Sequence, residues 1–186
     1  MKIYFIRHGK TYGNVMKRYI GKTDEQLCES GIKELEKLSF QKSELLICSP
    51  MKRCIQTAEI LFPIQKYVIC DSLRECDFGD FEGKNYLDLS ENNYYQSWID
   101  SGGILPFPNG ESPLSFRNRC TDGFKEIVRQ YADMNSISFV VHGGTIMSIL
   151  SKFSVLNFDY FEWHCENGHG YSCEWNGKNL TDTERI

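Results

Sequence analysis

Four short runs of apolar residues, separated by helical patterns, constrain the fold of this chain of 186 residues more than any other feature. They lie at residues 2–6, 45–48, 67–70 and 137–141. Each run is continuous rather than alternating, as expected of strands that are covered on both faces. The pattern predicts an α/β domain with a mostly parallel central sheet and helices on both faces, in a three-layer, Rossmann-like arrangement.

The segments between these runs have apolar residues at helical spacing. They follow Ser30, Ser49-Pro50 and Ser112-Pro113, and a further helix is expected over residues 145–153. Serine caps helix N-termini and proline is tolerated at the first helical position, so each Ser-Pro pair predicts a helix start. Gly123 weakens the third helix by about 1 kcal/mol relative to alanine. The apolar spacing continues through it, so we expect this helix to be unbroken.

Two segments depart from the alternation of strands and helices. Residues 170–181 contain Asn176-Gly177 between strand-like stretches, which predicts a β-hairpin with a type I′ turn at the sheet edge. Residues 81–110 are rich in aromatic residues and end in a Pro-rich loop, which predicts a helical excursion over the active site. Its aromatic side chains fit two interpretations, a substrate lid or ordinary packing against the domain. We expect residues 1–186 to form a single domain.

Composition and charge exclude several classes of protein. The formal net charge is -4, so the chain has no general attraction to nucleic acid or to acidic membranes, and any anion site must be local. The first apolar stretch is too short and too charged for a secretory signal, and no later run approaches membrane-spanning length. We therefore expect a cytoplasmic protein, a monomer or a homodimer, with no nucleic-acid or membrane partner.

The eight cysteines include no Cys-x-x-Cys pair. Without a secretory signal, reduced and mostly buried thiols are the expected state. His164, Cys165, His169 and Cys173 form the one cluster that could hold zinc, but their spacing matches no standard zinc finger. The expected content of metal and of cofactor is none.

Two of the apolar runs end in a histidine followed by glycine, at His8-Gly9 and at His142-Gly143. In an open α/β sheet, ligands bind outside the carboxyl ends of the strands. Arg7, Arg53 and Glu75 also follow strand exits, so we expect two arginines, two histidines and one carboxylate at a single edge. The glycines allow backbone amides to approach an oxyanion closely. This set of groups predicts a site for a phosphoryl group.

The same groups can carry out chemistry as well as binding. Arginines bind tetrahedral oxygens and disfavour protonation of a neighbouring imidazole, so His8 can attack as a neutral nucleophile. Glu75 can protonate the departing alkoxide and then activate water to hydrolyse the phosphohistidine. The positive groups would supply what magnesium provides in other phosphoryl transferases. Taken singly, each residue is more often structural, and only their convergence favours a catalytic site.

Five segments of the chain resemble the motifs of the histidine phosphatases, the phosphoglycerate mutase superfamily. They occur in the family's order between residues 3 and 146 and begin at Arg7, Ser49, Leu73, Asn109 and Val141. The resemblance implies the phosphoglycerate mutase-like fold and catalysis through a phosphohistidine without a metal.

The resemblance also implies individual roles. His8 is the expected nucleophile and Glu75 the expected proton donor. The expected phosphate pocket consists of Arg7, Arg53 and His142 with Gly143, assisted by Asn14. The carbonyl of Gly9 is expected to orient the ring of His8. The implied partner is a small-molecule phosphate monoester.

Mutases of this superfamily tend to carry a longer insertion over the site. The excursion at 81–110 is short, and poor exclusion of water commits the phosphohistidine to hydrolysis, which favours a phosphomonoesterase. Residues 19–24 and 77–83 look most like those of α-ribazole phosphatases, which implies α-ribazole 5′-phosphate as substrate in cobalamin biosynthesis. The alternatives are a phosphatase of sugar phosphates or of broad specificity, a phosphoglycerate mutase, and a catalytically silent phosphate-binding regulatory module.

Overall fold

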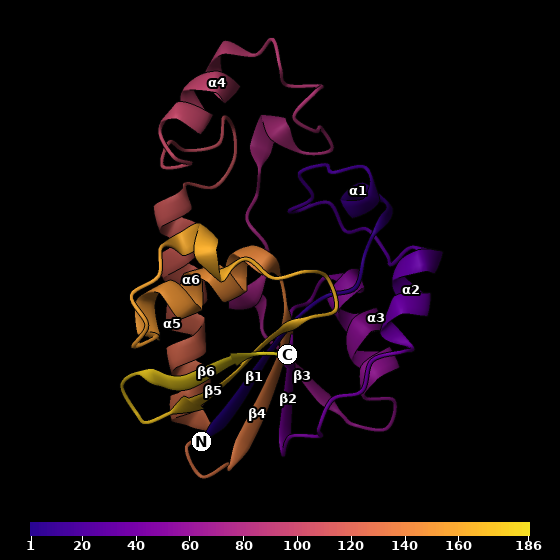
Figure 1. The fold of residues 1–186 in the computed structure, drawn as a ribbon, viewed down its shortest axis with the longest axis vertical. Helices are drawn as coiled ribbons and strands as arrows, with labels where there is room; N and C mark the ends of the chain where they lie inside the picture. The colour runs from indigo at the N-terminus through magenta and orange to yellow at the C-terminus, as the bar shows by residue number, and fades with distance from the viewer.

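Six strands form one sheet in the computed structural model, which describes all 186 residues (Figure 1). The strand order is β3-β2-β4-β1-β5-β6. The strands are β1 Lys2–Arg7, β2 Leu45–Cys48, β3 Tyr67–Ile69, β4 Ser136–Val141, β5 Gly170–Trp175 and β6 Leu180–Arg185. The first four pair in parallel, and β5 and β6 add an antiparallel edge. The predicted α/β class and the mostly parallel sheet are confirmed.

Helices cover both faces of this sheet, as the continuous apolar runs predicted. One face packs against α5 (Pro113–Gln130) and α6 (Gly143–Phe153), and the other against α3 (Lys52–Leu61), which also contacts α2 (Glu29–Leu35). Successive strand residues supply the two cores: Phe5 belongs to the first and Ile6 to the second. Both are fully buried, as expected for a strand with helices on either side.

Two of the predicted helix starts are wrong. Ser49-Pro50 does not begin α3, because the Ser49 amide donates to the Val140 carbonyl (3.1 Å) and so continues the sheet. Its hydroxyl is bonded to His142 (2.7 Å), and Met51 caps the helix without a side-chain bond. Ser30 lies inside α2, which is capped by Cys28. A serine near an apolar pattern therefore does not fix the helix start when tertiary contacts use its hydroxyl.

The third predicted start and the unbroken helix are confirmed in α5. The Ser112 hydroxyl accepts from the Ser115 amide (3.1 Å), and proline occupies the first helical position. The helix continues through Gly123, and its packing explains the glycine. A Cβ there would lie 2.6 Å from the Cβ of Ser72, so glycine lets α5 pack closely against the short 3-10 helix Asp71–Leu73 (η1).

The C-terminal hairpin forms at the predicted edge of the sheet, but the predicted type I′ turn is wrong. Such a turn needs positive φ at two consecutive central residues. Only Gly177 has it, at 95°, and the loop closes between Asn176 and Asn179 (3.1 Å). The Asn176 side chain accepts from the amides of Lys178 and Asn179, so a local side-chain turn replaces the expected geometry.

Three short elements complete the chain around the carboxyl edge of the sheet. They are α1 (Tyr12–Val15), the 3-10 helix Gly79–Phe81 (η2) and the 3-10 helix Tyr160–Trp163 (η3). The excursion at 81–110 contains α4 (Asn93–Asp100), which lies far from the sheet at the top of Figure 1. Phe81, Tyr95 and Phe107 are buried there in a third apolar cluster that also includes Phe116 of α5.

No helix is both long enough and apolar enough to cross a bilayer. All eight cysteines are free thiols, and six of them are buried. Burial raises the pKa of the Cys54 thiol to about 12, with the buried thiols of Cys120 and Cys173 shifted alike.

Candidate active site

The two His-Gly segments meet at the carboxyl edge of the sheet because β1 and β4 are parallel neighbours. Arg7 lies opposite Val141, and the His8 amide donates to the Val141 carbonyl (2.9 Å). The rings of His8 and His142 follow at once, with centroids 5.2 Å apart. The sheet register alone therefore brings together two groups that are 134 positions apart in the sequence.

The ring of His8 is held in one tautomer. Its Nδ1–H donates to the Gly9 carbonyl (2.7 Å), the contact that the resemblance led us to expect, and Nε2 is left with a free lone pair. Burial lowers the pKa of His8 well below its ordinary value, and the charges of Arg53 and Arg7 lower it further. The imidazole is therefore neutral at pH 7, the form that can attack phosphorus.

His142 has a protein partner on each ring nitrogen. The Nε–H of Arg53 donates to Nδ1 (3.3 Å), so Nε2 carries the proton and donates to the Ser49 hydroxyl (2.7 Å). Burial, Arg53 and His8 lower the pKa of His142 well below its ordinary value. A direct bond from this ring to a phosphate would have to replace its bond to Ser49.

Arg53 lies in the first turn of α3 and is wholly buried. Its terminal nitrogens donate to the carbonyls of Gly21 and Thr23, both at 2.8 Å. Together with the bond to His142, these contacts use three of the five N–H groups of the guanidinium. Two N–H groups remain for an anion.

Arg7 stands beside the start of α6. Its Nη1 donates to the Cys165 carbonyl (2.7 Å) and to Nε2 of His164 (3.3 Å). Its Nε is buried and has no partner. A Cβ on Gly143 would lie only 3.3 Å from that Nε, so glycine leaves room for the guanidinium beside the helix N-terminus. The unpartnered N–H is a donor available to an anion at this point.

Glu75 reaches the same place from the segment after η1. Its carboxylate accepts from the amides of Cys76 (3.0 Å) and Gly144 (3.4 Å). Burial raises the pKa of Glu75 above its ordinary value, although these amides and the two arginines oppose the shift. A Cβ on Gly144 would lie 2.5 Å from the carboxylate, so this glycine is needed for the approach. The acid is therefore biased toward its protonated form.

Asn14 lies at the rim of the site rather than beside Glu75. Its Oδ1 accepts from the Thr11 amide (3.1 Å) at the start of α1 and from the Asn167 side chain (3.3 Å). It lines a neighbouring basic cavity with Arg7, Lys17 and other polar groups. The structure thus brings together His8, Arg7, Arg53, Glu75, His142 and Gly143, and Asn14 shares the neighbouring cavity with Arg7.

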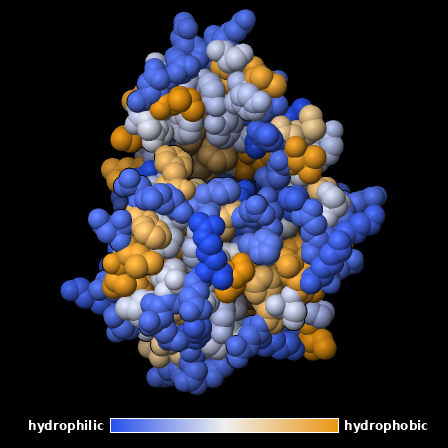
Figure 2. Space-filling view, viewed as in Figure 1, coloured by the Kyte–Doolittle hydropathy of each residue, from blue (hydrophilic) through white to orange (hydrophobic).

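A cavity of about 230 Å³ opens onto Arg7, Glu75 and Gly143. About half of its remaining lining residues are aromatic: Tyr19, Phe78, Trp98, Phe107, Phe116, Tyr160 and Phe161. Figure 2 shows the surface hollowed between the lobe that carries α4 and the body of the molecule, with apolar residues in the hollow. The aromatic residues of the excursion pack against the domain, and Phe107 of the buried third cluster also lines the cavity. A role of the excursion as a substrate lid stays a prediction.

Sequence reasoning missed several residues at this site. Tyr160 and His164 come from the connection between α6 and β5, and Arg117 stacks on the Tyr160 ring at 3.8 Å. A cluster of aromatic residues at 158–163 was the available signal. Arg119 of α5, which contacts the backbone of Glu75, had no signal in the sequence.

No three His, Cys, Asp or Glu side chains gather closely enough to hold a metal ion. The candidate zinc cluster is not assembled: His164 is bonded to Arg7, and the Nδ1 of His169 faces the Ile186 carbonyl (3.3 Å).

The model of the histidine phosphatase superfamily (branch 1) matches residues 3–182. The chain is 26% identical over 166 residues to the adenosylcobalamin/α-ribazole phosphatase of Escherichia coli, covering 82% of this chain and 78% of that protein. It is 27% identical over 150 residues to phosphoserine phosphatase 1 of Hydrogenobacter thermophilus, covering 76% and 71%.

A solved structure, the α-ribazole phosphatase from Shigella flexneri, has the same fold. Its TM-score is 0.82 at 24% identity, with 97% of this chain and 94% of that chain covered. The family match spans nearly the whole sequence, and these two relatives are phosphatases by name. The chain therefore belongs to the histidine phosphatase superfamily, branch 1, and is a hydrolase of phosphate monoesters.

Proposed function

We propose that the chain is a metal-independent phosphomonoesterase that works through a phosphohistidine on His8. The observation that carries this proposal is the bond from Nδ1 of His8 to the Gly9 carbonyl (2.7 Å). It presents a neutral Nε2 within a site that also holds Arg7 and Arg53, whose charges lower the pKa of the ring.

In the first step, Nε2 of His8 attacks the phosphorus atom and the bond to the leaving oxygen breaks. Arg7, Arg53 and the amide of Gly143 hold the phosphoryl oxygens by charge-assisted bonds. The protonated carboxyl of Glu75 gives its proton to the leaving oxygen, so the alcohol departs neutral. The raised pKa of Glu75 supports this role because it favours the protonated form.

In the second step, the Glu75 carboxylate takes a proton from water, and the water oxygen attacks the phosphohistidine. The N–P bond breaks, and His8 returns to its neutral form with release of inorganic phosphate. Glu75 is again protonated, so both residues end each cycle as they began.

The wall of the cavity supports a flat, apolar leaving group. Aromatic side chains such as Trp98, Phe107 and Tyr160 can stack on a planar ring, and Glu75 lies at the same cavity. Among the expected substrates, α-ribazole 5′-phosphate meets this description, because its base is an aromatic bicycle. We propose it as the physiological substrate, in line with the named relative from Escherichia coli.

Arg117 favours a second candidate, a phosphate ester with a carboxylate in its leaving group. It lines the cavity, stacks on Tyr160 and belongs to no ion pair. A guanidinium in this position can bind a carboxylate such as that of phosphoserine, the substrate in the name of the relative from Hydrogenobacter thermophilus.

The test is hydrolysis of a substrate panel by the purified chain in excess EDTA. The panel contains phenyl phosphate, α-ribazole 5′-phosphate, O-phosphoserine and 3-phosphoglycerate. We expect turnover with EDTA, the highest kcat/KM on α-ribazole 5′-phosphate, and an acid-labile phosphoenzyme after rapid quench. His8→Ala should lose activity roughly 10³-fold or more and form no phosphoenzyme.

His169→Ala is the matched control, because this histidine is exposed and lies outside the cavity. It should retain full activity. An active His8→Ala chain, or activity that disappears with EDTA and returns with a metal, would contradict the proposed mechanism. If O-phosphoserine gives the highest kcat/KM, it replaces α-ribazole 5′-phosphate as the proposed substrate.

A further inference from the structure

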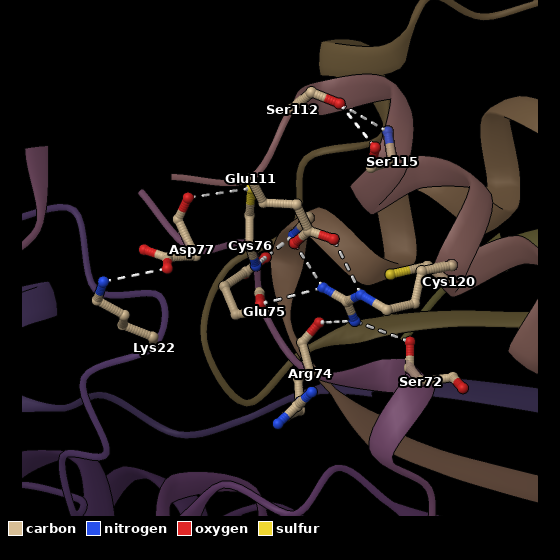
Figure 3. Close-up of polar contacts among 12 residues, drawn as sticks. Lys22, Ser72, Arg74, Glu75, Cys76, Asp77, Glu111, Ser112, Ser115 and Cys120 are labelled. Carbon is tan, nitrogen blue, oxygen red and sulfur yellow. Dashed lines mark hydrogen bonds and ion pairs between the residues drawn. The ribbon is translucent and has the colours of Figure 1, made fainter. Parts of the chain in front are cut away.

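Arg119 uses all five N–H groups of its guanidinium, on Glu111 and on the acid segment, which is residues 72–75 ending in Glu75. Nε and Nη2 donate to the two carboxylate oxygens of Glu111, at 3.0 and 2.7 Å. Nη1 donates to the carbonyls of Ser72 and Arg74, both at 3.0 Å, and Nη2 reaches the Glu75 carbonyl at 3.5 Å. In Figure 3, dashed lines from the Glu111 carboxylate and from the backbone oxygens of Ser72 and Arg74 meet at one unlabelled guanidinium, and these bonds identify it as that of Arg119.

These bonds leave no free carbonyl in the segment 72–75. The one carbonyl that Arg119 does not take, that of Leu73, accepts from the Thr145 hydroxyl of α6 (3.3 Å). Helices α5 and α6 together therefore fix every carbonyl of the segment that carries Glu75. The backbone that directs the Glu75 side chain is thus held at four successive carbonyls.

Glu111 is itself anchored. Its amide donates to the Asp77 carbonyl (2.9 Å), and a Cβ on the preceding Gly110 would lie 2.5 Å from that same carbonyl. The Glu111 carboxylate thus holds Arg119 from a turn that is packed against the backbone of Asp77, two residues after Glu75. Glu111 and Arg119 are only 21% and 25% exposed at their side chains, so water weakens this pair less than a surface pair.

We infer that Arg119, held by Glu111, is a positioning residue that fixes the Glu75 carboxyl at the leaving-group oxygen. This inference rests on the proposed function, in which Glu75 is the acid. Arg119 does not line the aromatic cavity and instead lines a second pocket that also includes Glu75. Its charge is paired with Glu111, so it acts through the backbone and not through a direct contact with substrate.

A positioning residue differs from a merely structural arginine in the step of the reaction that its loss slows. Loss of position at Glu75 slows protonation of the leaving group, which matters for an alkyl ester and little for p-nitrophenyl phosphate. Binding of the phosphoryl group depends on Arg7 and Arg53 and should not change. Lysine keeps the charge but cannot serve five acceptors in a fixed plane.

The experiment compares Arg119→Lys with wild type on an alkyl phosphate and on p-nitrophenyl phosphate. For the alkyl ester we expect kcat to fall about 10- to 100-fold, with KM and inhibition by inorganic phosphate changed less than about threefold. For p-nitrophenyl phosphate we expect a loss of less than about threefold. Arg129→Lys, an exposed position on the same helix, is the matched control and should match wild type on both esters.

Glu111→Gln provides a second variant if Arg119→Lys does not fold, as judged by thermal unfolding. It keeps Arg119 but removes the carboxylate that orients it, so it should show the same split between the two esters. Equal losses on both esters, a change in KM alone, or full activity in a folded variant would overturn the inference and leave the proposed function intact. A wild-type chain without phosphatase activity would overturn both.

Discussion

The pKa values of His8 and Glu75 are shifted in opposite directions because both side chains are buried. Burial disfavours the charged form of each, so it lowers the pKa of the imidazole and raises that of the carboxyl. The neutral imidazole needed for attack persists below pH 6.5, and the protonated acid persists above pH 4.5. We therefore expect a bell-shaped dependence of kcat/KM on pH, with an acidic limb from His8 and a basic limb from Glu75.

Glu75→Gln should remove the basic limb, because the side chain no longer loses a proton as the pH rises. It should lower kcat for an alkyl phosphate about 10²- to 10³-fold and for an aryl phosphate much less. Steady-state rates from pH 4 to 9 on both esters provide the measurement. If the basic limb remains in the variant, another group is the acid.

The residues of this site differ in how far the sequence could predict them. His8, Arg7 and His142 stand directly at strand ends, so a parallel sheet is enough to bring them together. Arg119 bonds to carbonyls of a segment that is distant in the sequence, and this contact can be seen only once α5 is packed against that segment. Tyr160 was missed for the same reason, because its place depends on how the chain returns from α6 to β5.

At the scale of the helices, α5 carries Arg119 and begins at a side-chain cap. Ser112→Ala removes the bond to the Ser115 amide (3.1 Å) and should cost about 1 kcal/mol of unfolding free energy. Ser30→Ala is the matched control. This serine is exposed inside α2, and its hydroxyl bonds to the Cys28 thiol (3.1 Å) and not to a free helix amide, so we expect almost no loss.

Urea unfolding followed by circular dichroism measures both variants. The prediction for α5 fails if the two serines prove equivalent. The two variants also distinguish serines that look alike in the sequence, since both precede an apolar helical pattern. Such a serine marks a helix start only where its hydroxyl is free to cap the helix.

Periodicity predicted the strands well and the turns poorly. The apolar runs of β1, β2 and β4 are continuous because both faces of the sheet are covered there. The run in the edge strand β3 is not covered in this way, since Val68 is 42% and Ile69 43% exposed. The hairpin turn at Gly177 depends on competition between backbone and side-chain bonds, and the Asn176 side chain wins. The start of α3 was set by tertiary contacts in a similar way, because Ser49 bonds to Val140 and His142.

For the molecule as a whole, a bound phosphate should stabilise the fold. No ion pair includes Arg7 or Arg53, although both lie at the carboxyl edge of the sheet. Inorganic phosphate at a hundredfold excess over its Kd should add about 2.7 kcal/mol and raise Tm by about 5–10 °C. Calorimetry with and without phosphate is the measurement, and a matched concentration of potassium chloride is the control. An equal shift in chloride would mean that general screening is the cause.

Arg53 shows what such a site demands of the chain that carries it. Its guanidinium is wholly buried and is satisfied by carbonyls of Gly21 and Thr23 rather than by a carboxylate. A carboxylate there would relieve the burial of a charge but would occupy the place of the substrate. Stability of the fold and catalytic turnover therefore make opposite demands on Arg53. A substitution that removes this buried charge should increase stability, and we expect it to persist only in chains that no longer need catalysis.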